Sequence, residues 1–64
     1  MDIKISMKAA RVNAGMTLRD AAKALGVATA TLVSWEQGRT SPTLEKARKL
    51  SEIYNFPLEH IFLQ

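Results

Sequence analysis

Hydrophobic side chains recur every three or four residues along most of this chain. This spacing places them on one face of an α-helix, and no stretch shows the strict alternation that predicts a β-strand. The first predicted helix has Met7, Ala10 and Ala14 on its apolar face, with Val12 beside them. Gly15 then predicts the end of this helix, because glycine readily takes the left-handed backbone conformation.

The stretch from 17 to 38 predicts two short helices joined by a tight turn. The apolar face of the first of these helices consists of Leu18, Ala21, Ala22 and Leu25. Gly26 interrupts that helix, Val27 follows as a buried turn residue, and the next helix starts near Thr29. The inward-facing residues of this next helix are Leu32 and Trp35. Because the break is so short, the two helices must cross steeply, which is the geometry of a helix-turn-helix motif. In DNA-binding proteins the second helix of this motif lies in the major groove.

Other residues mark where these helices begin and end. Thr17 is a good N-cap, and Asp20 stands three residues later, at the position of the acid in a capping box. Gly38 can end the third helix in the left-handed conformation. Pro42 disfavours a helical conformation at the residue before it, so residues 39–42 are expected to form a loop.

A fourth helix is predicted from Thr43 to Tyr54. The residues expected to be buried on it are Leu44, Ala47, Leu50, Ser51 and Tyr54. Asn55 tolerates the left-handed conformation that would follow this helix. Pro57 begins a short fifth segment, in which the residues expected to point inward are Leu58, Ile61 and Phe62. The pattern thus predicts an all-α fold, a compact five-helix bundle that forms a single domain over residues 1–64.

The composition narrows the class of protein. Sixty-four residues form one domain, near the lower size limit for folding without disulfides or metals. There is no cysteine, which fits a cytoplasmic location. Asp2 and Lys4 interrupt the start and no apolar run is long enough for a membrane span, so neither a signal peptide nor a membrane helix is expected. Nine Lys and Arg against six Asp and Glu give a net charge of +3 and a pI of about 9.7. This balance favours a polyanionic partner, although ordinary solubility explains so modest a charge equally well.

Three stretches together resemble a known family. MTLRDAAKALGV is followed by a helix that ends in WEQGR, and then by SPTLEKARKLSEIYNFPLEHIF. This order resembles the phage-repressor and Cro type of helix-turn-helix domain, the xenobiotic-response-element family, over about Met7 to Leu63. The WEQG turn followed by Pro42, Leu44 and a closing LxxIF sequence at 58–62 is specific in combination. The resemblance implies a five-helix domain of the lambda-repressor-like type that binds operator DNA, commonly as a dimer on a two-fold site.

The outward face of the third predicted helix is the candidate surface for DNA bases. Helical spacing separates Leu32, Trp35 and Glu36 on one side from a second set, which comprises Thr29, Ala30, Val33, Ser34 and Gln37. Spacing alone is also compatible with an ordinary exposed surface. The resemblance implies base contacts from Thr29, Ala30 and Ser34, with Val33 nearby. The family often has Gln, Arg or Asn there, whereas this chain has small hydroxyl and methyl groups. Direct base readout should therefore be modest, with more weight on phosphate contacts and DNA shape.

Candidate phosphate contacts lie near the ends of the motif helices. They are Leu18, Arg19, Gln37, Arg39, Thr40 and Lys46. At Leu18 the family usually has a glutamine that touches phosphate, so this chain lacks that side-chain contact. Backbone N–H groups at a helix start can still hold a phosphate, and Arg19 is close enough to replace the lost donor. The other basic residues of the second and fourth helices are expected to form a solvated face; they are Lys23, Arg48 and Lys49.

Two opposite charges are expected to meet inside the domain. Arg11 falls on the core-facing side of the first predicted helix, and Glu36 on the core-facing side of the third. The resemblance implies that residues at these places form an ion pair that locks the two helices together. An unpaired charge there would be costly, so pairing is favoured over a chemical role for either residue.

The sequence lacks the parts of an enzyme, a metal site or a cofactor site. His60 is the only histidine, and no glycine-rich loop could cradle a nucleotide.

Two functions from different classes stay open. The first is a sequence-specific DNA-binding transcriptional regulator that inserts the helix at about 29–37 into the major groove. Of the two modes of regulation, repression is the expected one. The second is an antitoxin-like or accessory protein-interaction module on the same fold, which the methyl-rich face of the third helix leaves open.

Assembly is expected to follow from the small size of one domain. A single head reads few bases, so we expect a weak homodimer on a two-fold operator, with half-sites about one helical turn apart. The candidate dimer surface is near the C-terminal end: Phe62 and Leu63 close the chain, and Ile53 is out of phase with the buried residues of the fourth helix. An exposed isoleucine is also compatible with a scattered surface residue.

Overall fold

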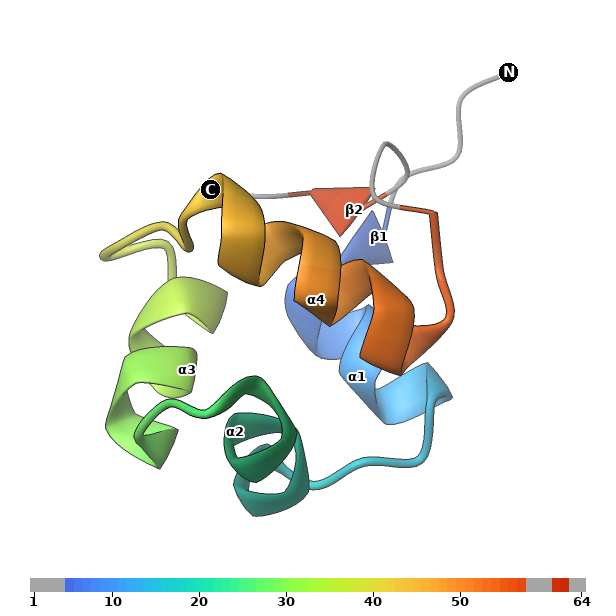
Figure 1. Ribbon diagram of the computed structural model, residues 1–64, viewed down its shortest axis with the longest axis horizontal. Helices are drawn as coiled ribbons and strands as arrows, with labels where there is room; N and C mark the ends of the chain where they lie inside the picture. The colour runs from blue at the N-terminus through green and yellow to red at the C-terminus, as the bar shows by residue number, and fades with distance from the viewer. Residues whose placement is uncertain (1–4, 58–60, 63–64) are drawn as a thin grey trace.

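The protein is described by a computed structural model that covers residues 5–57 and 61–62. Within these residues the chain forms four helices and two short strands. In chain order they are β1 (Ile5–Ser6), α1 (Met7–Asn13), α2 (Leu18–Leu25), α3 (Thr29–Glu36), α4 (Leu44–Tyr54) and β2 (Ile61–Phe62). The strands lie beside α1, whereas α3 lies at the opposite edge of the molecule, next to α2 (Figure 1).

The four described helices end in the same local structure. In each case a residue with positive φ follows the last turn, and the residue after it donates its N–H to the carbonyl five positions back. The residues with positive φ are Gly15, Gly26, Gly38 and Asn55, at 74°, 72°, 76° and 52°. The bonds run from Met16 to Arg11, Val27 to Ala22, Arg39 to Ser34 and Phe56 to Ser51, at 3.0–3.2 Å. This is the Schellman arrangement, which satisfies carbonyl groups that the helix leaves open. The predicted left-handed ends are confirmed.

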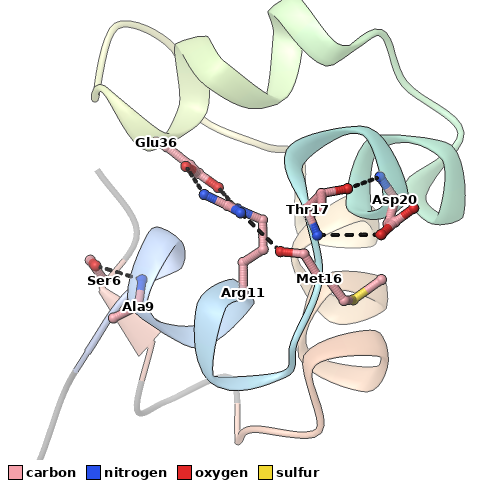
Figure 2. Close-up of polar contacts among 7 residues, drawn as sticks. All are labelled: Ser6, Ala9, Arg11, Met16, Thr17, Asp20 and Glu36. Atoms are coloured by element: carbon pink, nitrogen blue, oxygen red, sulfur yellow. Dashed lines mark hydrogen bonds and ion pairs between the residues drawn. The ribbon is translucent and has the colours of Figure 1, made fainter.

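Three of these helices begin with a side-chain cap. The hydroxyls of Ser6 and Thr43 accept from the backbone N–H three residues ahead, at 3.0 and 3.2 Å. The Thr17 hydroxyl accepts from the Asp20 N–H at 3.1 Å, and the Asp20 carboxylate accepts from the Thr17 N–H at 3.4 Å (Figure 2). The predicted capping box is therefore confirmed. α3 differs from the other helices, because its N-cap is Ala28 and no described side chain caps it.

The core lies where the helices meet. Its fully buried leucines come from three helices: Leu25 of α2, Leu32 of α3 and Leu50 of α4. The other buried apolar residues are Met7, Ala10, Ala21, Ala22, Trp35, Ala47, Tyr54 and Ile61. Each of these residues belongs to a predicted inward-facing set, so the helical spacing predicted the core correctly at these positions.

The predicted fifth helical segment is wrong, and so is the prediction that the chain has no strand. Residues 61–62 form β2, which pairs in parallel with β1; Ile5 lies opposite Ile61 and Ser6 lies opposite Phe62. Ile61 is buried as predicted, but backbone pairing with the start of the chain holds its segment in place of helical bonds. β-branched isoleucines at 5 and 61 suit this extended conformation. The described residues therefore form four helices closed by a small parallel sheet, and Leu58 lies outside the described residues.

Several residues predicted to be buried are accessible. Leu44 is 64% exposed, because it is the first residue of α4 and stands one turn before Ala47, the first residue of that helix to reach the core. Ala14 is exposed, because α1 ends before it. Val27 and Ser51 are only half-buried. The errors at 14 and 44 lie at helix ends. Helical periodicity predicts burial there, but no described element covers these two side chains.

Candidate nucleic-acid interface

α3 turns one side into the core and the other side outward at the edge of the molecule (Figure 1). Leu32 is 0% exposed and Trp35 is 6% exposed, so the predicted inward side is confirmed. The opposite side, here called the outward face of α3, consists of Thr29, Ala30, Val33 and Ser34. The first two of these residues are exposed and the last two are half-buried. The four candidate base-contacting residues therefore lie on one accessible side of one helix.

The end of α2 is held by a long side chain from α4. The Nζ atom of Lys46 donates to the carbonyl oxygen of Leu25 at 2.9 Å. Leu25 is the last residue of α2, so the ammonium group satisfies an open carbonyl and lies at the negative end of the helix dipole. The structure thus gives Lys46 an internal partner beside the turn of the motif. The phosphate contact predicted for it stays a prediction.

The expected ion pair between Arg11 and Glu36 is present and connects three parts of the chain. Nε of Arg11 donates to Oε2 of Glu36 at 2.8 Å, and Nη2 donates to Oε1 at 3.4 Å. Nη1 donates to the backbone carbonyl of Met16 at 2.9 Å, in the loop between α1 and α2 (Figure 2). The two charged side chains are only 9% and 8% exposed. The hydrogen bond to Glu36 raises the pKa of Arg11 further above its ordinary value, against the opposing effect of burial. The pair therefore fixes α3 to α1 next to the candidate interface.

Tyr54 places a second polar group in the interior, which sequence reasoning missed. Its hydroxyl is buried and has no hydrogen-bond partner among the described residues. Burial raises the pKa of Tyr54 to about 12; the charge of Glu36 adds to this effect, and the charge of Arg11 opposes it. Helical spacing predicted the burial of the ring, but it carries no information about a partner for the hydroxyl.

The loop after α3 is fastened to the outward face of α3 through one residue. The hydroxyl of Thr40 donates to the hydroxyl oxygen of Ser34, with 3.0 Å between Oγ1 and Oγ. The backbone N–H of Arg39 donates to the carbonyl of the same serine, also at 3.0 Å. A candidate base contact is thus joined to two candidate phosphate contacts. Sequence reasoning missed the hydroxyl pair, because six residues and a chain reversal separate the two side chains.

A surface hollow of about 340 Å³ lies between α1, the start of α2 and the end of α3. Its lining residues are Lys8, Arg11, Leu18, Val33, Glu36 and Gln37. Three of these, at 18, 33 and 37, are candidate DNA contacts, so the structure brings them together. The side chain of Leu18 packs against the core, which leaves its backbone N–H as the group available to a phosphate. Lys8 is an exposed cation in the same hollow, and sequence reasoning missed it. The two arginines at 19 and 39 are exposed.

Comparison with known proteins agrees with this geometry. The sequence matches the helix-turn-helix family of the Cro/C1 type over residues 7–61. The chain belongs to this family. The resemblance read from the sequence is therefore confirmed.

Its relatives include two archaeal proteins. A helix-turn-helix-type transcriptional regulator of Archaeoglobus fulgidus is 36% identical over 53 residues, which cover 83% of this chain and 76% of the relative. A regulator of the same description from Methanocaldococcus jannaschii is 33% identical over 61 residues, which cover 95% of this chain and 92% of the relative. No solved structure matches the chain.

The residues predicted to form the dimer surface of this helix-turn-helix domain are only partly described. Ile53 is half-buried and packs against the core. It is out of phase with the buried residues of α4, and this position predicted a more exposed side chain. The side chain of Phe62 and the whole of Leu63 lie outside the described residues, as does His60. The dimer surface stays a prediction.

The described part of the helix-turn-helix domain was also searched for other kinds of site. Residues 5–57 and 61–62 contain no group of three or more His, Cys, Asp or Glu side chains that could hold a metal ion. Within the same residues, no helix is long and apolar enough to cross a membrane.

Proposed function

We propose that this helix-turn-helix protein is a DNA-binding transcription regulator that inserts α3 into the major groove of duplex DNA. The observation that carries the proposal is the two-sided burial of α3. Leu32 and Trp35 anchor the helix in the core, while Thr29 and Ala30 stand exposed at the edge of the molecule. The names of the archaeal relatives, which are transcriptional regulators, support the same function.

The chemistry of the outward face determines how DNA is read. The methyl groups of Ala30, Val33 and Thr29 suit the C5-methyl group of thymine, and the hydroxyls of Thr29 and Ser34 each make one hydrogen bond with a base edge. No side chain of this face makes a bidentate pair, so each contact discriminates modestly between bases. Phosphate contacts from Arg19, Arg39 and the hollow beside Leu18 supply much of the affinity, and DNA shape contributes to the specificity.

We further propose that the protein represses transcription by occupying its operator as a weak homodimer. One head of this size contacts too few base pairs for useful specificity. Two heads on half-sites about one helical turn apart double the contacts and make the operator two-fold symmetric. A dimer surface near Ile53, in the last turn of α4, would leave α3 of each subunit accessible.

The placement of α3 is tested with a charge on its outward face. We expect Ala30→Glu to abolish binding to duplexes selected from a random pool, because the carboxylate would meet the negative DNA surface, while the thermal unfolding curve stays unchanged. Asn13→Glu is the matched control: it adds the same charge at an exposed position of α1 and should leave binding unchanged.

Two results would contradict the proposal. Unchanged affinity of a folded Ala30→Glu protein would show that α3 does not face the DNA. A wild-type protein whose binding to duplex DNA is absent, or does not weaken with salt, would remove DNA as the partner, because phosphate neutralisation makes affinity fall steeply with salt. That second result would favour a protein-interaction module.

A further inference from the structure

The hydroxyl pair at the end of α3 restricts the orientation of the Ser34 side chain. A hydroxyl has one hydrogen and two acceptor lone pairs. Oγ1 of Thr40 and Oγ of Ser34 lie 3.0 Å apart, so one hydroxyl donates to the other and the bond uses one hydrogen-bonding group of each side chain. Within the described part of the chain, Ser34 has no other side-chain partner. The remaining hydrogen-bonding groups of its hydroxyl are therefore left for a group outside the protein.

The pair is also held in place by the backbone. The N–H of Arg39 donates to the carbonyl of Ser34, and Gly38 turns the chain with a φ of 76°. These two features bring residue 40 back over the last turn of α3. Without the hydroxyl of Thr40, the Ser34 side chain would be free to rotate and to donate to the carbonyl of Ala30, four residues back, as serines in helices often do.

We propose that Thr40 is a positioning residue for base recognition, which fixes the orientation of the Ser34 hydroxyl toward the major groove. This inference rests on the proposed function. A hydroxyl held in one orientation reaches one position of the groove, where the base pairs differ in the hydrogen-bonding groups that they present. A single hydrogen bond of this kind corresponds to about a three- to tenfold preference in affinity.

The test compares base preferences of four proteins: wild type, Ser34→Ala, Thr40→Val and Thr40→Ser. Each is used to select duplexes from a random pool, and the Kd is then measured for the selected operator with each of the four bases at every position. We expect one position per half-site at which the wild type prefers the contacted base about three- to tenfold. Ser34→Ala and Thr40→Val should both lose this preference at the same position and keep the preferences elsewhere. Thr40→Ser retains the hydroxyl and should keep the wild-type pattern.

The double variant Ser34→Ala/Thr40→Val separates positioning from an independent contact. If Thr40 acts through Ser34, the double variant has the base preferences of Ser34→Ala, and the two substitutions are not additive at that position. Ser34 is half-buried and Thr40 is exposed, so the unfolding midpoints of the variants should agree and a folding defect cannot imitate the result.

The remaining outcomes overturn the inference in distinguishable ways. A uniform loss of affinity in Thr40→Val on every sequence, with base preferences intact, would make Thr40 a phosphate contact without a positioning role. A consensus that neither variant changes, in a protein that binds DNA with normal salt dependence, defeats the inference and leaves the proposed function standing. Absence of salt-dependent DNA binding by the wild type defeats both.

Discussion

Removing one partner of the Arg11–Glu36 ion pair should take away a large part of the stability of the protein. The two side chains are 9% and 8% exposed, so the remaining charge would be left almost buried without a counter-charge. Breaking a pair in such surroundings costs about 3–5 kcal/mol. A domain of 64 residues has a total free energy of unfolding of roughly 3–10 kcal/mol. A single substitution therefore brings the protein close to unfolding at room temperature.

The structure predicts that the two partners differ in their effect. Arg11→Met removes both bonds to Glu36 and also the 2.9 Å bond to the Met16 carbonyl, so it should cost the full amount. Glu36→Gln keeps an oxygen that can accept from Arg11, so it should cost less. The assay is urea unfolding followed by the fluorescence of Trp35, the only tryptophan and one that is buried in the core. Lys49→Met removes an exposed cation from α4 and should change the free energy of unfolding by less than about 0.5 kcal/mol.

Two measurements can refute this reasoning. A loss below about 1 kcal/mol in Arg11→Met would place the pair among solvent-screened surface pairs. The double variant Arg11→Met/Glu36→Leu should recover much of the loss, because an apolar replacement of a buried pair leaves no charge stranded. If the double variant instead lost the sum of the Arg11→Met and Glu36→Leu effects measured singly, the cost would come from packing and not from the unpaired charge.

Two other substitutions test single groups. Arg39→Ala should weaken DNA binding by a similar factor on all sequences and lower the salt slope by about one unit, as expected of a phosphate contact; a changed base preference would make Arg39 a base reader. Tyr54→Phe should leave the free energy of unfolding at neutral pH unchanged or raise it by up to about 1 kcal/mol, because it removes a buried hydroxyl without a partner. The pKa of Tyr54 is about 12 in the folded protein and about 10 in an unfolded chain, so the folded state binds the proton more strongly. The wild type should therefore lose stability relative to Tyr54→Phe as the pH rises from about 10 to about 12, and a constant difference over that range would contradict the burial of the hydroxyl.

Local signals predicted most of this fold. The capping pair Thr17–Asp20 and the left-handed residue Asn55 act within one turn of their own helix, so the sequence is sufficient to find them. The β1–β2 pair depends on residues 5 and 61 meeting in space, and two-residue strands show no alternation. The helical prediction at 61 failed for this reason. Burial of Leu44 was wrongly predicted because periodicity does not show which turn of a helix reaches its neighbours.

In the candidate site, too, some contacts could be predicted from the sequence and others could not. Arg11 and Glu36 could be assigned to each other because both charges fall on core-facing positions and the family resemblance implies an ion pair at these places. The bond between Thr40 and Ser34 depends on the path of the loop, which Gly38 allows but does not specify. The phosphate assignment of Lys46 rested on charge alone, and charge does not reveal that the side chain reaches back to a carbonyl of α2.

These contacts concentrate the anchoring of α3 in its second half. Leu32, Trp35 and Glu36 bind it to the core and to α1, and the carbonyl and hydroxyl of Ser34 hold the loop that follows. The first turn of α3 takes no part in this anchoring, because no described side chain caps it and its residues at 29 and 30 are exposed. Substitutions in the first turn therefore leave core packing and the ion pair intact. On the proposed function, the fold separates the residues that hold α3 in place from those that meet the bases. Base preference can then change at 29 and 30 with little loss of stability, whereas a change at 34 alters the loop as well.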